Sequence, residues 1–370
     1  HITSLIMPNS FKHKEVFIII VLLSLFFSVG LLFSQPTHRI AGIILDKETG
    51  ESIPTVHVYI SQTTIGTTTK HDGTFEFSTK LTGMHTLVVS YVGYKTETKE
   101  INFYTDQKPY FEVELTPEPI ELAPLEVTAS NKDWQRNFKI FRDNFIGLTN
   151  AAENTEIENP WIIDFELDEK ENLVATANRP LTIYNYTLGY EIRVDLVEFK
   201  WPKKGEPGYY LFHSSYSEIE PINGRQQKRW ERNRQDTYLG SFEHFLKSLY
   251  QNSLKENNFD VVVPNTHSVV KLDPLDSISA AGLRLHAKIT GLSSENVKAY
   301  LLNSPVDVLY GKRWFNKDRV RSRITPEARG GIFVVTDQAR LANPLALKLG
   351  GPWSTHRLAN LLPTDYNLNE

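Results

Sequence analysis

The sequence contains no cysteine among its 370 residues. This absence excludes disulfides, thiolate metal sites, cysteine nucleophiles and an N-terminal cysteine that could carry a lipid. It leaves the redox compartment open, because an exported protein can fold without disulfides.

Common catalytic and cofactor motifs are also missing. None of the eleven histidines stands in an H-x-x-E or H-E-x-x-H pattern, so the usual ligand spacing of zinc peptidases is absent. The nucleophile elbow, the P-loop and the dinucleotide-binding glycine pattern are absent too. The acids at 272–277 lack the glycine and distal glutamate of an EF-hand. We therefore expect no catalytic, metal-binding or cofactor-binding residues, and no cofactor.

Neither sign of charge dominates the chain. The formal net charge is -4, which gives no whole-chain argument for a nucleic-acid partner, and we expect none. The apolar fraction of 40% and the charged fraction of 23% are ordinary for a globular protein. The length is sufficient for two or three domains with separate cores.

One long apolar run stands near the start, from Val16 to Phe33, behind a short basic region. We expect Met7 to be the initiator and residues 1–34 to be an export signal that is cleaved after Ser34. The alternative is an uncleaved anchor, since 18 apolar residues just reach bilayer length and Leu32 is bulky for a cleavage site. Both readings predict an exported protein, in the periplasm or at the outer-membrane surface.

Residues 35–116 show short alternating strands separated by turns, which predicts a β-sandwich of about seven antiparallel strands. The stretch at 63–77, "TTIGTTTKHDGTFEF", predicts two strands paired as a hairpin around Asp72-Gly73, where a positive φ is required. His71 lies beside this turn; as a ligand or base it would need a cluster of partners, and none surrounds it in sequence. We expect it to be an exposed turn residue.

The pieces "IAGIILDKETGESIP", "TTIGTTTKHDGTFEF" and "VSYVGY" resemble the carboxypeptidase-regulatory-like domain, a transthyretin-like sandwich common in envelope proteins of Bacteroidetes. The resemblance covers about residues 38–116 and implies no peptidase activity, because the family's sandwich carries no catalytic residues. Residues 121–130, "ELAPLEVTAS", resemble the segment through which related transporters contact TonB. The chain is too short for the 22-stranded barrel of such a transporter. An accessory role in TonB-linked uptake remains a hypothesis.

Residues 117–130 are predicted to be a proline-rich linker, and residues 131–370 an α+β domain of unknown function. Aromatic spacing predicts a core-facing helix over 134–148. A hairpin is expected at 162–167 and 173–177, and a half-buried strand at 190–201. On that strand we expect Glu191, Arg193 and Asp195 to form a solvated face. The sequence blocks of this half resemble those of other Bacteroidetes proteins that carry the same sandwich, and the resemblance implies no reaction.

The segment 224–259 is strongly basic at its start. A helix surface is the simpler interpretation; the alternative is a surface for an anionic partner such as a lipopolysaccharide headgroup or a polyanionic glycan. The candidate residues are Arg225, Lys228, Arg229, Trp230, Arg232 and Arg234.

Ser241 and His244 could form a nucleophile and its base, but Ser241 better fits the N-cap of a helix with Glu243 in its first turn. A hydrolase acting on peptides or glycans would draw on Trp230, Arg234, Tyr238 and His244.

Further strands are predicted within 306–315 and 330–336, and a short helix from Ser354 to Leu361 that Pro363 ends. The sequence as a whole favours a non-enzymatic envelope protein that binds a protein or glycan partner, with membrane association through the N-terminal segment if it is not cleaved.

Overall fold

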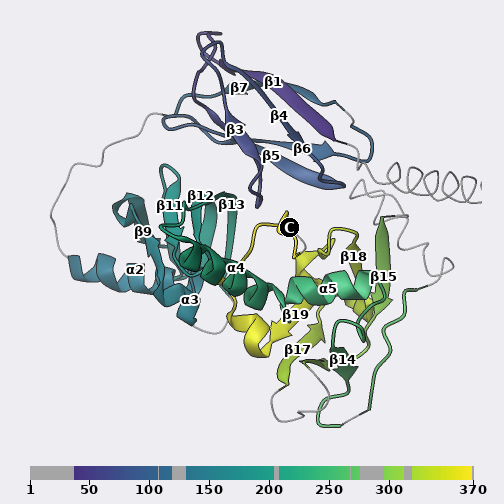
Figure 1. The fold of residues 1–370 in the computed structure, drawn as a ribbon. Coiled ribbons are helices and arrows are strands. Elements are labelled where there is room, and N and C mark those ends of the chain that lie inside the picture. Colours follow the sequence, from purple (N-terminus) through teal and green to yellow (C-terminus); the bar gives the residue numbers. More distant parts are fainter. Residues whose placement is uncertain are drawn as a thin grey trace, which may run out of the picture.

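A computed structural model describes residues 37–106, 108–118, 131–203, 208–266, 268–275, 296–311 and 319–368. The predicted export signal and the TonB-like segment lie outside these residues. Figure 1 shows a β-sandwich above two further groups of strands, with α4 and α5 running between and across those groups. In the described part of the chain, no helix has both the length and the apolar character needed to cross a membrane.

The N-terminal part is a sandwich of two sheets. One sheet has the order β4 (Thr74–Thr79), β1 (His38–Asp46), β7 (Tyr110–Leu115), and the other β3 (Gly66–Thr68), β2 (His57–Ile60), β5 (Met84–Ser90), β6 (Glu97–Asn102). The predicted seven strands are confirmed. The β1–β7 pair is parallel, whereas all other pairs in the sandwich are antiparallel. Val58, Phe75 and Val89 are buried between the sheets, as the alternation predicts.

The predicted hairpin at 63–77 is wrong, because β3 and β4 belong to different sheets. Gly73 does adopt a positive φ of 73°, and the Lys70 N–H donates to the Thr74 carbonyl oxygen at 2.8 Å. The turn crosses from one sheet to the other because β4 pairs with β1 over six residues, an alignment that turns Phe75 into the core. His71 is exposed at this turn, as expected.

The second part is a six-stranded sheet with helices α2 (Asn131–Phe145) and α3 (Asn150–Glu153) and the short turn η1 (Pro160–Ile162). The predicted core-facing helix, hairpin and long strand are confirmed. On α2, Phe141 and Phe145 are buried and pack on Phe199 and Tyr210 of the sheet. The strands are β8 (Thr155–Ile157), β9 (Ile163–Leu167), β10 (Leu173–Ala177), β11 (Leu181–Asn185), β12 (Tyr190–Trp201) and β13 (Tyr209–Glu218).

The third part has its own hydrophobic core, so residues 131–370 hold two cores. Helices α4 (Gly224–Tyr238) and α5 (Phe242–Tyr250) lead into two small sheets, β14-β16-β17-β19 and β15-β18. The strands are β14 (Phe259–Val262), β15 (Val297–Leu301), β16 (Val306–Tyr310), β17 (Val320–Pro326), β18 (Ile332–Thr336) and β19 (Leu347–Gly350). Both predicted strands are present as β16 and β18; residues 312–318 lie outside the described residues.

Short 3₁₀ turns complete this part: η2 (Arg329–Gly331), η3 (Pro344–Ala346), η4 (Gly351–Thr355) and η5 (Leu358–Asn360). The predicted helix from Ser354 to Leu361 is wrong, because His356 and Arg357 are extended between η4 and η5. Trp353 lies in the third part's core, whereas Leu358 lies in the second part's core. The chain is extended here because it connects two cores.

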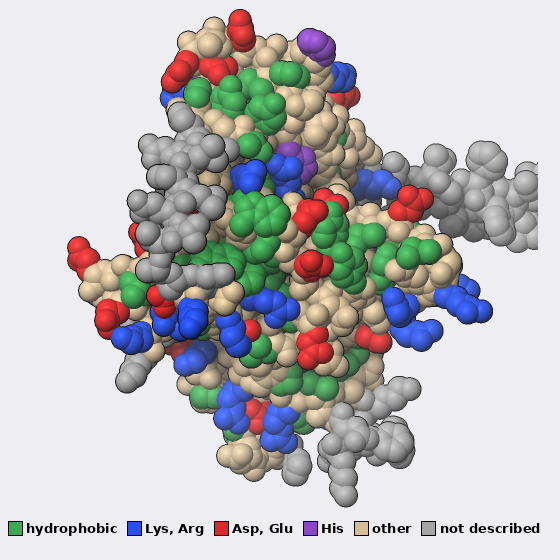
Figure 2. Space-filling view, turned by 90° about the vertical axis from the view of Figure 1, so that its left-hand side faces the viewer, with side chains coloured by type: hydrophobic (Ala, Val, Ile, Leu, Met, Phe, Trp, Pro, Cys, Tyr) green, Lys and Arg blue, Asp and Glu red, His purple; other side chains and the backbone are tan. Residues whose placement is uncertain are grey.

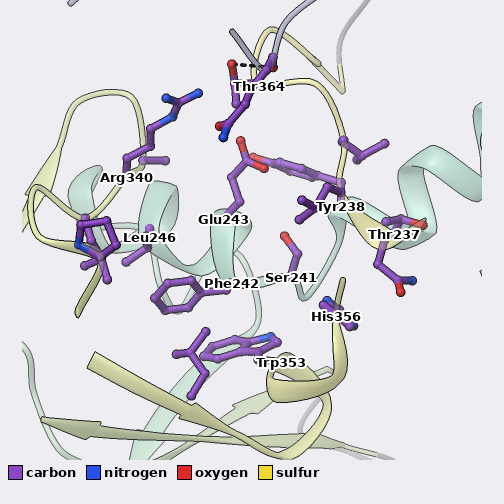
Figure 3. A pocket seen from close by; sticks show the side chains of 18 of the residues that line it. Thr237, Tyr238, Ser241, Phe242, Glu243, Leu246, Arg340, Trp353, His356 and Thr364 are labelled. Atoms are coloured by element: carbon purple, nitrogen blue, oxygen red, sulfur yellow. Dashed lines mark hydrogen bonds between the residues drawn. The ribbon is translucent and has the colours of Figure 1, made fainter. Parts of the chain in front are cut away.

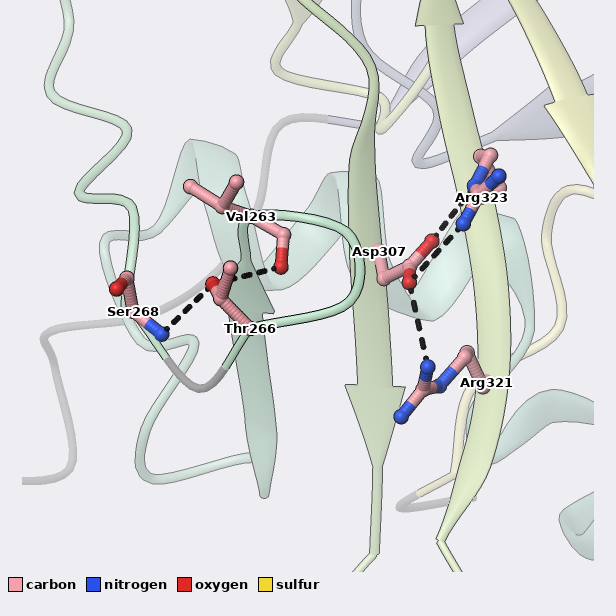
Figure 4. Close-up of polar contacts among 6 residues, drawn as sticks. All are labelled: Val263, Thr266, Ser268, Asp307, Arg321 and Arg323. Atoms are coloured by element: carbon pink, nitrogen blue, oxygen red, sulfur yellow. Dashed lines mark hydrogen bonds and ion pairs between the residues drawn. The ribbon is translucent and has the colours of Figure 1, made fainter.

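Polar groups inside the third part are closely paired (Figure 4). Asp307 on β16 is 1% exposed and accepts from Arg323 at 2.7 and 3.2 Å and from Arg321 at 3.5 Å. Asp307 and Arg323 stand directly opposite each other on neighbouring antiparallel strands, which is the favoured position for a cross-strand ion pair. After β14, a turn closes on the Thr266 hydroxyl, which donates to the Val263 carbonyl oxygen at 3.0 Å.

The sandwich packs on the polar face of β12, and this corrects the expected solvated face. Asp195 is 8% exposed, and its carboxylate accepts hydrogen bonds from Tyr59 at 2.6 Å, Ser90 at 2.5 Å and Thr96 at 3.1 Å. These three hydroxyls belong to the sandwich. Asp195 is buried because the outer face of β2 and β5 covers it, an arrangement that alternation within one strand cannot reveal.

Main-chain hydrogen bonds also join the sandwich to the rest of the protein. The Gln62 N–H donates to Ser214, the Tyr216 N–H donates to Thr63, and the Thr364 N–H donates to Gln62. The loop at 62–64 therefore lies between β13 and the C-terminal segment. Asp365 accepts from the Thr64 N–H at 3.0 Å, which further fixes the loop.

Candidate functional site

A cavity of about 580 Å³ lies where this loop meets β13, the α4–α5 turn and the C-terminal segment (Figure 3). Its volume is within the range of small-molecule sites. We call it the central cavity. Its lining residues are Gln62, Phe212, Tyr216, Thr237, Tyr238, Ser241, Phe242, Glu243, Leu246, Ala339, Arg340, Leu341, Pro344, Leu349, Trp353, His356, Asn360, Leu361, Leu362 and Thr364.

The turn between α4 and α5 places the acidic side chain of the cavity. Gly240 has a φ of 79°, and a Cβ there would lie 2.5 Å from the Tyr310 ring, so the position requires glycine. Ser241 then caps α5, because its hydroxyl accepts the His244 N–H at 3.0 Å. Glu243 follows in the first turn and points into the cavity, toward the space between Arg340 and Tyr238 (Figure 3).

Glu243 carries the most perturbed carboxyl group of the cavity. Burial raises its pKa to about 7, opposed by the positive charges of Arg340 and Lys247. Among the described residues, its carboxyl group accepts no hydrogen bond and forms no ion pair. Glu243 is half-buried and lines the central cavity. The group is therefore divided between its neutral and charged forms near neutral pH.

Arg340 supplies the opposite charge from the segment that follows β18. Burial lowers its pKa from the usual value, and the nearby Glu243 charge opposes that change. One terminal guanidinium nitrogen is buried without a hydrogen-bonding partner in the described part of the chain. Such a donor costs free energy unless a water or a ligand satisfies it.

Aromatic side chains form much of the remaining wall. The Trp353 indole N–H donates to the Gly240 carbonyl oxygen at 2.8 Å, and its ring lies 5.2 Å from that of Phe242. Burial raises the pKa of the Tyr238 hydroxyl, so Tyr238 stays neutral in the physiological range. The cavity therefore has a hydrophobic wall beside the Glu243 carboxyl group and the Arg340 guanidinium.

Two residues of the predicted partner surface are structural. Trp230 is 3% exposed, and its indole N–H donates to the Tyr186 carbonyl oxygen at 2.8 Å. Arg234 is 7% exposed; it pairs with Glu218 at 2.6 Å and lies 4.1 Å above the Tyr190 ring. Including them was wrong, because both lie on the face of α4 that packs on the turn between β11 and β12.

The other four residues of that prediction, Arg225, Lys228, Arg229 and Arg232, are exposed on α4. An anionic partner for them remains a prediction. On the face shown in Figure 2, Lys and Arg side chains occur in several groups interspersed with acidic and hydrophobic ones.

The proposed Ser241–His244 pair is not arranged for catalysis. The Ser241 hydroxyl bonds the main chain of His244, while the His244 ring accepts the Gly240 N–H at Nδ1, at 3.1 Å. Burial lowers the pKa of His244 to about 4. Of the residues grouped for the hydrolase hypothesis, Tyr238 lines the cavity, while Trp230 and Arg234 pack elsewhere.

Sequence reasoning missed that Glu243 and Arg340 line the same cavity. The first was interpreted only as a favourable charge in the first turn of a helix, and the second had no motif around it. Among the described residues, no group of three or more His, Asp or Glu side chains is placed to hold a metal ion.

A comparison with family models matches residues 40–127 to the CarboxypepD_reg-like domain. This segment is a CarboxypepD_reg-like domain. The domain fits a non-enzymatic structural or binding module. The match covers the sandwich and not the residues of the α+β part that line the central cavity. A search of curated proteins found no match.

Solved structures with some similarity include the group B streptococcus pilus 2b backbone protein, at 15% identity over 22% of this chain and 41% of that protein, with a TM-score of 0.19. A DUF3823 family protein from Parabacteroides merdae is 12% identical over 53% of this chain and 85% of its own, with a TM-score of 0.18. A streptococcal ancillary pilin is 10% identical over 52% of this chain and 61% of its own, with a TM-score of 0.20. These TM-scores are too low to support an argument about function.

Proposed function

We propose that this chain is an exported cell-envelope protein that binds a small organic ligand, a fragment of an envelope peptide or glycan, in the central cavity. The observation that supports it is that one cavity with aromatic walls holds the Glu243 carboxyl group and the Arg340 guanidinium, neither of which has an ion-pair partner among the described residues. The CarboxypepD_reg-like domain acts as a docking module and completes the cavity through Gln62.

Energetics favours a ligand at this position. An isolated charge away from bulk water costs several kcal/mol, roughly, even after relaxation. Two other buried carboxylates in the described part of the chain, Asp195 and Asp307, have hydrogen-bonding partners. Charged groups left unpaired in a concave site are typical of positions that recognise a ligand.

The test is isothermal titration calorimetry of the purified chain with a panel of di- and tripeptides and of neutral and acidic oligosaccharides. We expect at least one class to bind and Arg340→Met to weaken that binding at least about tenfold, the loss of one charge-assisted hydrogen bond. Arg179→Met, exposed between β10 and β11, is the matched control and should bind like wild type. Absence of binding by the whole panel, or equal binding by Arg340→Met, contradicts the proposal.

A hydrolase is the second candidate, and the raised pKa of Glu243 is the observation that favours it. A carboxyl group that titrates near pH 7 suits a general acid or base. Incubating the same panel with wild type and with Glu243→Gln, followed by mass spectrometry, separates the two candidates. Binding without cleavage supports the binding protein; cleavage that Glu243→Gln abolishes supports the hydrolase.

Export and the TonB-linked role are tested separately, on the full chain in cells. Fractionation should recover the protein in the envelope, and N-terminal sequencing should begin at Gln35 if the signal is cleaved. A chain that still carries Val16 is anchored instead. Deleting residues 121–130 should leave ligand binding unchanged, and a loss of TonB binding on this deletion would support the accessory role.

A further inference from the structure

We infer that the ligand of the central cavity is a small zwitterion of the amino-acid or peptide class, whose carboxylate is bound by Arg340 and whose ammonium group is bound by Glu243. The inference rests on the proposed function and narrows its ligand. Its basis is that one cavity holds two groups of opposite charge that do not pair with each other.

The two groups approach from different walls. Glu243 extends from the first turn of α5, and Arg340 extends from the segment after β18 (Figure 3). Each responds to the other's charge, but the ion pairs of the described residues include no contact between them. Both line the same cavity of about 580 Å³.

Charge balance selects the class of ligand. A simple anion would pair with Arg340 and be repelled by ionised Glu243, and a simple cation would leave Arg340 unpaired. A neutral sugar could hydrogen-bond to both groups, but it would neutralise neither. A zwitterion satisfies both groups and brings no net charge into the cavity.

The apolar wall indicates the side chain of the ligand. Phe212, Phe242, Leu246, Leu349 and Trp353 line the same cavity as the two charged groups. An apolar amino acid side chain would bury against them, and the removal of its apolar surface from water would favour binding. Leucine and leucyl-leucine are therefore suitable probes.

Binding should also release protons near neutral pH. The groups that interact with the Glu243 carboxyl are Arg340, Lys247, Tyr238 and Tyr216, and His356 lines the same cavity. Tyr238 stays neutral, and burial lowers the pKa of His356, so neither gains a charge at pH 7. A ligand ammonium group beside Glu243 favours its ionised form, and Glu243 then gives up its proton.

The experiment is calorimetry at pH 7 with leucine, leucyl-leucine, N-acetyl-leucyl-leucine, leucyl-leucine amide and a neutral disaccharide. We expect a ligand with both charges to bind and each blocked peptide to bind at least about tenfold more weakly. A comparison of the affinities for leucine and leucyl-leucine tells whether a free amino acid or a peptide is the better ligand. Repeating the titration in buffers of different ionisation enthalpy should reveal proton release.

Two variants test which residue binds the ammonium group of the ligand and which binds its carboxylate. Glu243→Gln should bind the N-acetyl peptide as well as the free peptide, and Arg340→Met should bind the amide as well as the free peptide. Both variants must first show wild-type circular dichroism, and Arg179→Met, exposed between β10 and β11, is the matched control. Equal binding of free and blocked peptides overturns the inference. Binding of the disaccharide alone, lost in Arg340→Met, also overturns it but leaves the proposed function standing; absence of all binding contradicts both.

Discussion

Two carboxyl groups lie where parts of this protein meet, and they differ in whether other residues donate hydrogen bonds to them. Asp195 accepts hydrogen bonds from three hydroxyls of the sandwich, whereas Glu243 has no partner among the described residues. The first arrangement holds the sandwich against the sheet. The second leaves a carboxyl group with which a ligand or water can pair. The difference separates an interface that stabilises the fold from a site that binds.

Asp307 extends the comparison inside the third part. It is as buried as any carboxylate described, yet its arginine partners remain about half exposed, at 46% for Arg323 and 54% for Arg321. Such partners can turn toward water when the acid is removed. We therefore expect the change in unfolding free energy to be largest for a substitution of Asp195, smaller for Glu243 and smaller again for Asp307.

The largest effect is expected for Asp195→Ala. Three hydroxyls lose their acceptor, and Tyr59 and Ser90 are fully buried, so we expect unfolding free energy to fall by about 3 kcal/mol. Urea denaturation measures it. The control Asp164→Ala, on the exposed side of β9, should change stability by less than about 0.5 kcal/mol. A similar small change in Asp195→Ala would mean that the interface does not depend on this carboxylate.

Glu243→Gln should show the next largest effect, and one that depends on pH. The folded protein holds this proton up to about pH 7, against 4.5 for an ordinary glutamate, so wild type loses stability as pH rises through that window. The variant lacks this loss and should be up to about 3 kcal/mol more stable than wild type at pH 8, and nearly equal to it near pH 4.5.

Urea denaturation of Glu243→Gln and wild type at pH 5 and pH 8 gives the difference. His57 and His244, whose pKa values burial lowers to about 4, destabilise both proteins alike as pH falls from 6.5, so they cancel. Glu156→Gln, exposed on β8, should show no such difference. A difference that does not vary with pH would refute the raised pKa.

Asp307→Ala should cost about 1–2 kcal/mol, less than Asp195→Ala, because Arg321 and Arg323 can be solvated after the change. Urea denaturation of the two variants side by side tests the ranking. A larger loss in Asp307→Ala would show that the exposed fraction of the partners does not decide the cost.

Ser241→Ala removes the N-cap of α5 and should lower stability by about 1 kcal/mol. Thermal unfolding measures the change, and Ser241→Asp, which keeps a capping oxygen, should restore most of it. If a hydrolytic activity is found and Ser241→Ala abolishes it without a change in stability, the capping role is insufficient.

Arg340→Met should have the smallest effect on stability, within about 0.5 kcal/mol of wild type, because it removes a guanidinium that has an unsatisfied buried nitrogen. Thermal unfolding without ligand measures this, and the same variant should lose ligand-dependent stabilisation. A loss of several kcal/mol without ligand would mean that Arg340 supports the fold.

The sandwich was largely predictable because its signals are local. The alternation of apolar and polar residues places Val58 and Val89 in the core, and Asp72-Gly73 marks a turn. Neither signal depends on which strands pair with each other. Pairing itself is not local: the β3–β4 turn joins two sheets, because β1 offers β4 a longer partner than β3 does. Asp195 was predicted to be solvated for the same reason: a pattern within one strand does not show which other domain covers it.

The amino-acid sequence by itself determined the strands of the sandwich, the helix at 131–145, the cap at Ser241 and the family of residues 40–127, because each depends on neighbours within a few positions. Only the tertiary structure decided which polar groups are satisfied. Glu243, Arg340 and Gln62 belong to three distant segments, and their environment depends on how those segments pack. Burial and unpaired charge are properties of that packing, and no local pattern encodes them.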